Sequence, residues 1–175
     1  MFEGLSEYRS DFTMAAKYSD SQIAGMIAER KPLPVNWRSR ITLRDKRGHK
    51  EREMDIAGEN GNEYRVILRQ GNFNTLDFSV ILALNSPASS QLFRLRRYNG
   101  KSHEHTNQLE GNTFYDFHIH YATERYQEFG GREDSFAEPS TTYSDFNSAV
   151  RCMFRDCGFE VPETEVANLF GEFDT

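Results

Sequence analysis

The chain has few of the residues that would cross-link it or place it in a membrane. Its two cysteines, Cys152 and Cys157, are spaced unlike those of a zinc knuckle or a redox CxxC motif. We therefore expect free thiols in a reducing compartment. The longest unbroken apolar run, residues 80–84, is far too short to span a membrane. The first residues lack the basic segment and apolar core of a secretory signal, so we expect a cytoplasmic protein with no membrane partner.

Several functional motifs are also missing. The chain contains no P-loop, no GxGxxG and no GxSxG. The motifs that usually indicate a nucleotide hydrolase, a Rossmann enzyme or a serine hydrolase are therefore absent. The net charge of −6 argues against nonspecific nucleic-acid binding through bulk charge. The charge is unevenly spread, however, because residues 38–52 and 94–101 are basic and residues 156–175 are acidic. Arginine dominates the basic residues, which favours planar recognition of phosphate or carboxylate.

Hydrophobic periodicity predicts an α+β fold. Ser19 and Gln22 form a capping-box pattern that opens a short helix over residues 20–30. An apolar stripe over residues 144–157, with Ser144 as N-cap and Gly158 as the stop, predicts a longer C-terminal helix. Between the helices, six segments alternate with the period of a strand: residues 40–45, 52–58, 63–70, 75–84, 91–98 and 113–122.

These elements predict one domain. Short connections favour a curved antiparallel sheet of about six strands, with the short N-terminal and longer C-terminal helices packed on one face. We expect the domain to cover residues 19–160, after a flexible lead-in over residues 1–18 and before an acidic tail over residues 161–175. Trp37, the only tryptophan, is most simply a core anchor.

Histidines are concentrated in one part of the chain. Four of the five fall between residues 103 and 120, and the sharpest element is HIHY at residues 118–121. Strand alternation places one set of side chains on a core face, namely Tyr115, Phe117, Ile119 and Tyr121. The opposite face receives Phe114, Asp116, His118 and His120. If the strands share a sheet, its helix-free face carries arginine, histidine and aspartate together.

Three interpretations of this face remain open. In the first, polar side chains of a half-buried strand simply meet solvent. In the second, the face binds a metal ion, whose identity the sequence leaves unknown, through His103, His105, His118, His120 and Glu110. The run HEHTNQLE in part resembles the HxH-x4-E ligand pattern of cupin barrels. In the third, the face binds an anion or a phosphodiester: His118 and His120, with His103, supply acid and base, and Arg94, Arg96 and Arg97 hold phosphate.

The segment from LFRLRRYNG to HIHYATERY resembles small bacterial families of unknown function. In these families a strand ending in Asn-Gly leads to a histidine-containing loop and then to a strand with a His-x-His pair. The resemblance covers about residues 18–160 and implies that His118 and His120 are functional, followed by His103 and Asn99. Members often lie near toxin–antitoxin, prophage or phage-defence genes, which implies a role in bacterial conflict.

Together these points lead to two main functional hypotheses. The first is a small cytoplasmic protein of bacterial conflict systems that binds or cleaves RNA, a nucleotide or another phosphodiester, as a metal-independent ribonuclease. The second is a non-enzymatic interaction protein, an antitoxin or an inhibitor of a defence complex, that recognises a protein partner by surface complementarity. A cupin-like metal-binding enzyme is the third.

Overall fold

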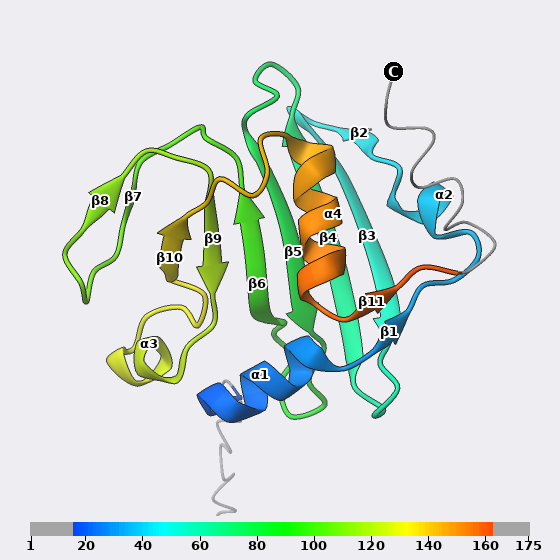
Figure 1. Ribbon diagram of the computed structural model, residues 1–175, viewed down its shortest axis with the longest axis horizontal. Coiled ribbons are helices and arrows are strands. Elements are labelled where there is room, and N and C mark those ends of the chain that lie inside the picture. The colour runs from blue at the N-terminus through cyan, green and yellow to red at the C-terminus, as the bar shows by residue number, and fades with distance from the viewer. Residues whose placement is uncertain (1–15, 163–175) are drawn as a thin grey trace, which may run out of the picture.

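An open antiparallel sheet of seven strands forms the frame of the molecule (Figure 1). The computed structural model describes residues 16–162. The strand order is β10-β9-β6-β5-β4-β3-β2. In chain order these strands are β2 (Arg44–Lys46), β3 (His49–Ala57), β4 (Glu63–Gly71), β5 (Phe78–Leu84), β6 (Phe93–Asn99), β9 (His118–Tyr121) and β10 (Phe136–Pro139). The predicted α+β class with an antiparallel sheet is confirmed.

Two short strand pairs lie outside this sheet. β1 (Lys31–Pro32) pairs in parallel with β11 (Phe159–Glu160). β7 (His105–Thr106) pairs with β8 (Thr113–Phe114) as a hairpin that stands beyond the β9–β10 end of the sheet (Figure 1). The β1–β11 pair joins the start of the domain to its end, and the β7–β8 hairpin brings one histidine of the candidate site to the sheet.

Four helices complete the described part of the chain: α1 (Asp20–Ala28), α2 (Trp37–Ile41), α3 (Glu124–Phe129) and α4 (Phe146–Asp156). α1 begins with the predicted capping box, in which Ser19 and Gln22 exchange hydrogen bonds with each other's backbone. α4 lies across one face of the sheet (Figure 1) and is capped by Asp145, one residue after the predicted Ser144. Among the described residues, none of the helices combines the length and apolarity that crossing a membrane would require.

Gly158 ends α4 as the sequence predicts. Its φ angle of 71° lies in the left-handed region that glycine adopts without strain. A Cβ atom at this position would also come within 2.3 Å of the Glu29 carbonyl oxygen. Glycine is therefore required both by the backbone conformation and by the close approach of the chain after α1.

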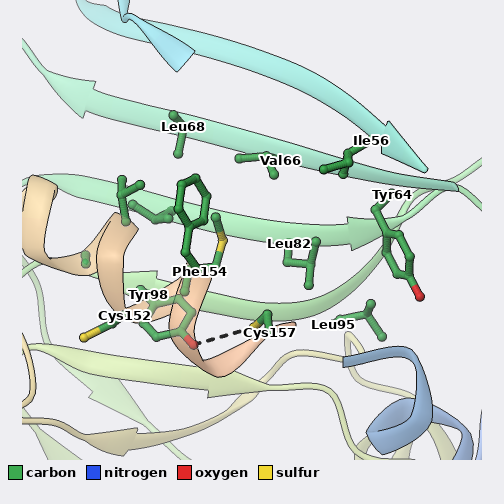
Figure 2. Close-up of a cluster of buried hydrophobic side chains, with 14 of the residues drawn as sticks. Ile56, Tyr64, Val66, Leu68, Leu82, Leu95, Tyr98, Cys152, Phe154 and Cys157 are labelled. Atoms are coloured by element: carbon green, nitrogen blue, oxygen red, sulfur yellow. Dashed lines mark hydrogen bonds between the residues drawn. The ribbon is translucent and has the colours of Figure 1, made fainter. Parts of the chain in front are cut away.

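The hydrophobic core lies between α4 and the sheet (Figure 2). Its strand side is formed by buried residues that alternate along β4, β5 and β6, including Val66, Leu68, Leu82 and Leu95. Tyr98 is also fully buried and donates its hydroxyl hydrogen to Asp156 at 3.0 Å. Cys152 and Cys157 are buried free thiols, as expected. The buried Trp37 packs edge-on against Phe154, so its predicted role as a core anchor is confirmed.

Two predicted strands differ from the observed ones. The segment expected as a strand over residues 40–45 begins inside α2, and only residues 44–46 pair with β3. The segment expected as one strand over residues 113–122 is divided between β8 and β9. β8 pairs with β7 and β9 pairs with β6, so the chain leaves one ladder and enters another between them. The alternation of side chains between the two faces of a strand is interrupted at that break. Tyr115, which was expected in the core, is therefore 51% exposed.

The two predicted terminal segments fall largely outside the described residues. Residues 1–15 of the expected lead-in and residues 163–175 of the expected acidic tail belong to this group. Tyr18, at the end of the lead-in, contacts Phe93 edge-on with ring centroids 4.9 Å apart. Its backbone also exchanges hydrogen bonds with Gln127. The folded domain therefore begins slightly before residue 19.

Candidate metal centre

Three histidines from two strand pairs meet at one point of the structure. His105 comes from β7, and His118 and His120 come from β9. One ring nitrogen from each lies within 4.8 Å of the others. The His105 and His120 ring centroids are 4.7 Å apart, and those of His118 and His120 are 4.9 Å apart. The structure thus brings together residues whose proximity the sequence left open.

The site is on the face of the sheet opposite α4, yet it is not open to solvent. His118 is 0% exposed and His120 is 3% exposed. β9 lies between β6 and β10, and His105 of the β7–β8 hairpin packs against both β9 histidines. The interpretation of these histidines as the solvated face of a half-buried strand is therefore wrong for His118 and His120.

Backbone carbonyls fix the tautomers of the two β9 histidines. His118 Nδ1 is 2.7 Å from the carbonyl oxygen of Asp116, and His120 Nδ1 is 2.8 Å from that of Asp134. A carbonyl oxygen can only accept a hydrogen bond, so Nδ1 of His118 carries the hydrogen. Nδ1 of His120 also lies 3.1 Å from Arg97 Nη2, but its contact with the Asp134 carbonyl is shorter, and we assign the hydrogen to Nδ1 there as well. The Nε2 atom of each ring is then the acceptor, and the amide nitrogen of Asn99 lies 3.3 Å from each of them. Metal-binding histidines have this arrangement, in which the second nitrogen donates to a carbonyl or carboxylate.

The tautomer of His105 is set by a side-chain amide. Its Nε2 lies 3.0 Å from Asn107 Oδ1. The orientation of Asn107 is fixed because Oδ1 accepts the backbone N–H of Ala137 at 2.9 Å and Nδ2 donates to the Ala137 carbonyl at 2.8 Å. His105 Nε2 must therefore donate, which leaves Nδ1 as the acceptor. All three imidazoles thus have one nitrogen that donates to the protein and one that is available to a ligand.

Burial keeps these imidazoles neutral. Desolvation is the main cause that lowers the pKa of His118 to about 4, and it lowers the pKa of His120 further, with the nearby Arg97 charge as the second cause. Desolvation also lowers the pKa of His105. Neutral imidazole is the form that binds a metal ion. At pH 7 the cluster is therefore in its metal-binding form.

The three arginines predicted to hold phosphate are divided between the two faces of the sheet. Arg97 is paired with His120 in the β6–β9 register, so it lies on the histidine face. The Arg94 backbone and side chain both contact Glu133, which is not among the site residues. Arg96 lies on the α4 face, where its guanidinium stacks 4.5 Å from the ring centre of Tyr121.

The division of the arginines has a physical cause in the strand geometry. The β5–β6 register shifts between Leu82 and Ala83, because one extra residue is accommodated in β6. The bulge reverses the alternation within the segment, so Arg94 and Arg96 do not share a face as predicted. Arg96 is therefore not placed near the histidines, which corrects that part of the predicted phosphate site.

A cavity of about 400 Å³ opens beside the histidines. Its walls include Arg97, His103, His105, His120 and Arg132. Two guanidiniums in this wall share one carboxylate: Nε of Arg97 and Nε of Arg132 each lie 2.9 Å from an oxygen of Asp134. Two positive charges against one negative charge leave this side of the cavity positive.

Two residues of the predicted metal set lie outside the cluster. His103 is exposed at the cavity, with its ring centroid 5.4 Å from that of His118. Glu110 accepts a hydrogen bond from Tyr126 Oη at 2.6 Å and is ion-paired with Arg125. The structure therefore does not bring Glu110 to the histidines, and the HxH-x4-E pattern of cupins is not the ligand set. The open sheet is also not a closed barrel.

The residues that support the histidines could not be found in the sequence alone. Asp134 reaches His120 only because β10 folds next to β9, and Asn107 is oriented towards His105 by the backbone of Ala137 in β10. Asn99, which the family resemblance implied, is paired with His118 across β6 and β9. The contacts of Asp134 and Asn99 join residues distant in sequence, and the spacing of two between His105 and Asn107 is not distinctive, so no local pattern indicates these roles.

No family model, curated protein or solved structure matches this chain. The resemblance of residues 18–160 to small bacterial families therefore stays an expectation. Any function has to be inferred from the side chains and the cavity themselves.

Proposed function

We propose that the protein binds one divalent transition-metal ion through His105, His118 and His120 and uses it to hydrolyse a phosphate ester. The observation that supports this most directly is the set of three neutral imidazoles, each with its second nitrogen bonded to a protein acceptor. Three protein ligands that leave a position for water are the usual set of a catalytic zinc ion.

The ligand chemistry favours a transition metal over magnesium or calcium. Imidazole nitrogen suits zinc, copper, iron and nickel, whereas magnesium and calcium prefer oxygen ligands. The cluster offers three nitrogens and no carboxylate among the residues that the structure describes. Zinc, which binds histidine at about 2.0–2.1 Å, is the simplest occupant.

Hydrolysis would begin with a metal-bound water. A catalytic zinc ion lowers the pKa of this water to about 7, so hydroxide is available at neutral pH. In hydrolysis a water oxygen would form the bond to phosphorus, the P–O bond to the leaving group would break, and a proton lost by the water would pass to the leaving oxygen. The exposed His103 at the cavity is the group placed to transfer that proton. Arg97 and Arg132 supply donors for the phosphate oxygens.

A metal-independent ribonuclease fits the site less well. Such a mechanism needs one protonated histidine at neutral pH, and burial lowers the pKa of His118 to about 4. RNA and nucleotides nevertheless belong to the proposed substrate class. The role in bacterial conflict, the cytoplasmic location and a protein partner from a defence system stay predictions.

Elemental analysis of the purified protein tests the proposal. We expect about one equivalent of a transition metal in the wild type after zinc addition and gel filtration, and none in a His118→Ala/His120→Ala double variant. His49→Ala is the matched control, because His49 is bonded to Glu51 on β3 and is not part of the cluster. Metal-dependent cleavage of bis(p-nitrophenyl) phosphate should follow the same pattern. A wild-type protein that retains no added zinc, cobalt or iron would overturn the proposal.

A further inference from the structure

A buried asparagine contacts the same two nitrogens that the metal would use. Asn99 of β6 is 2% exposed, and its amide nitrogen lies 3.3 Å from His118 Nε2 and 3.3 Å from His120 Nε2. The two amide hydrogens match the two lone pairs. Ser79 Oγ donates to the other end of the amide, Asn99 Oδ1, at 2.9 Å. The carboxamide is therefore held between a hydroxyl group and two imidazoles.

Metal binding is incompatible with this arrangement. A lone pair that coordinates a metal ion cannot also accept an amide hydrogen. The amide hydrogens of Asn99 must therefore leave both Nε2 atoms when the metal enters. Asn99 is buried in β6, between β5 and β9, so its side chain has no room to leave the site. The amide group can instead rotate about its own bond.

A rotated amide would place oxygen where nitrogen now lies. Ligands of a tetrahedral ion with bonds of about 2.05 Å are about 3.3 Å apart. The amide end of Asn99 is 3.3 Å from each Nε2, which matches that separation. Ser79 does not oppose the rotation, because its hydroxyl can donate to Oδ1 or accept from Nδ2.

We propose that Asn99 is a fourth metal ligand through Oδ1, and that its amide flips when the ion binds. The inference rests on the proposed metal-binding function and identifies a ligand beyond the three histidines. Asn99 reaches the site from β6, whereas the cavity is lined by His105, His120 and the arginines. Water and substrate can therefore occupy a further coordination position on the cavity side, as zinc sites with five ligands allow.

Cobalt binding to Asn99 variants tests this inference. Asn99→Leu keeps the approximate shape and removes the oxygen, so we expect Co²⁺ affinity to fall by about tenfold or more and the visible d–d spectrum to change. Asn99→Asp supplies an oxygen without a flip and should retain tight binding. If wild type and Asn99→Leu bind Co²⁺ equally and with the same spectrum, Asn99 is not a ligand, although the histidine site stands. If wild type binds no Co²⁺ or Zn²⁺, the proposed function fails as well.

A measurement on the wild type covers the case in which Asn99→Leu does not fold. In the metal-free protein, the Asn99 amide hydrogens should show nuclear Overhauser contacts with the His118 and His120 rings. After Zn²⁺ addition these contacts should disappear, and contacts with the Ser79 side chain should take their place. An unchanged pattern in the zinc-loaded protein would overturn the flip.

Discussion

Two buried polar clusters lie towards opposite ends of the sheet, and they differ in whether they are complete (Figure 1). One surrounds Lys31 in β1, and the other is the histidine cluster on β9 and the β7–β8 hairpin. Lys31 is 0% exposed and donates to the carbonyl oxygens of Met26, Ile27, Glu29 and Cys157 at 2.8–3.1 Å. These carbonyls lie where α1 and α4 end, so one ammonium group caps two helices.

The two clusters differ in how well their polar groups are bonded. Burial lowers the pKa of Lys31 to about 8, which still leaves it protonated at pH 7. Its three hydrogens find acceptors without any ligand. In the histidine cluster, acceptor nitrogens of His118 and His120 share only the two amide hydrogens of Asn99, at distances of 3.3 Å. Such long contacts are weak. The Lys31 cluster is therefore satisfied by the protein alone, whereas the histidine cluster keeps weakly bonded acceptors, which is the basis of the metal-binding proposal.

The largest effect that would sharpen this comparison is expected at Lys31. Lys31→Met keeps the length of the side chain but leaves buried carbonyls without a donor, which should lower the free energy of unfolding by about 3 kcal/mol or more. The folded molecules of this variant should bind zinc with the affinity of the wild type. Urea denaturation measures the loss, with Lys101→Met as the control, because Lys101 forms an exposed ion pair with Asp116. Equal stability of the two variants would contradict the structural role of Lys31.

The sequence predicted the parts of this fold that depend on local pattern. The capping box at Ser19, the stripe of α4 and the central strands all follow from spacing along the chain. The histidine pair was recognised for the same reason. The bulge in β6, which places Arg94 and Arg96 on opposite faces, and the break between β8 and β9 have no local signature. They result from which strands pair, and pairing is decided by contacts distant in sequence.

The same distinction explains what was missed in the site. Twelve residues lie between His105 and His118, and only the folded hairpin places their rings 5.4 Å apart. Asp134 supports His120 from outside β9, and the spacing of two between His105 and Asn107 is not distinctive, so the sequence offers no clue to either role. The chemistry of a site whose ligands come from different strands can thus be guessed from residue types, but its ligand set cannot.

An intermediate effect is expected from acid, and it should come mainly from the histidine cluster. The pKa of His118 is lowered from 6.5 to about 4 by burial, so the unfolded chain binds this proton first as the pH falls. Stability from the neutral imidazole is therefore present above pH 6.5 and is lost as the pH falls from 6.5 to 4, by about 3 kcal/mol. Urea denaturation in EDTA at several pH values measures this slope.

A matched variant separates this contribution from the rest of the protein. His118→Gln removes the titrating group, and its stability should fall less between pH 6.5 and 4 than that of the wild type. His49→Gln should keep the full wild-type slope, because His49 lies on β3 outside the cluster. Parallel curves for wild type and His118→Gln would show that another group controls the acid response.

The smallest effect is expected at the cavity, where the histidine cluster meets solvent. Arg132→Ala removes one of the two guanidiniums that share Asp134, and its side chain is 51% exposed, so stability should change by less than about 1 kcal/mol. Inorganic phosphate should bind the zinc-loaded variant about fivefold more weakly, because one charged donor is lost. Isothermal titration measures this change. Arg125→Ala is the control, because Arg125 pairs with Glu110 and does not line the cavity. Equal phosphate affinity in wild type and Arg132→Ala would mean that the ligand enters the cluster by a route that does not depend on this positive wall.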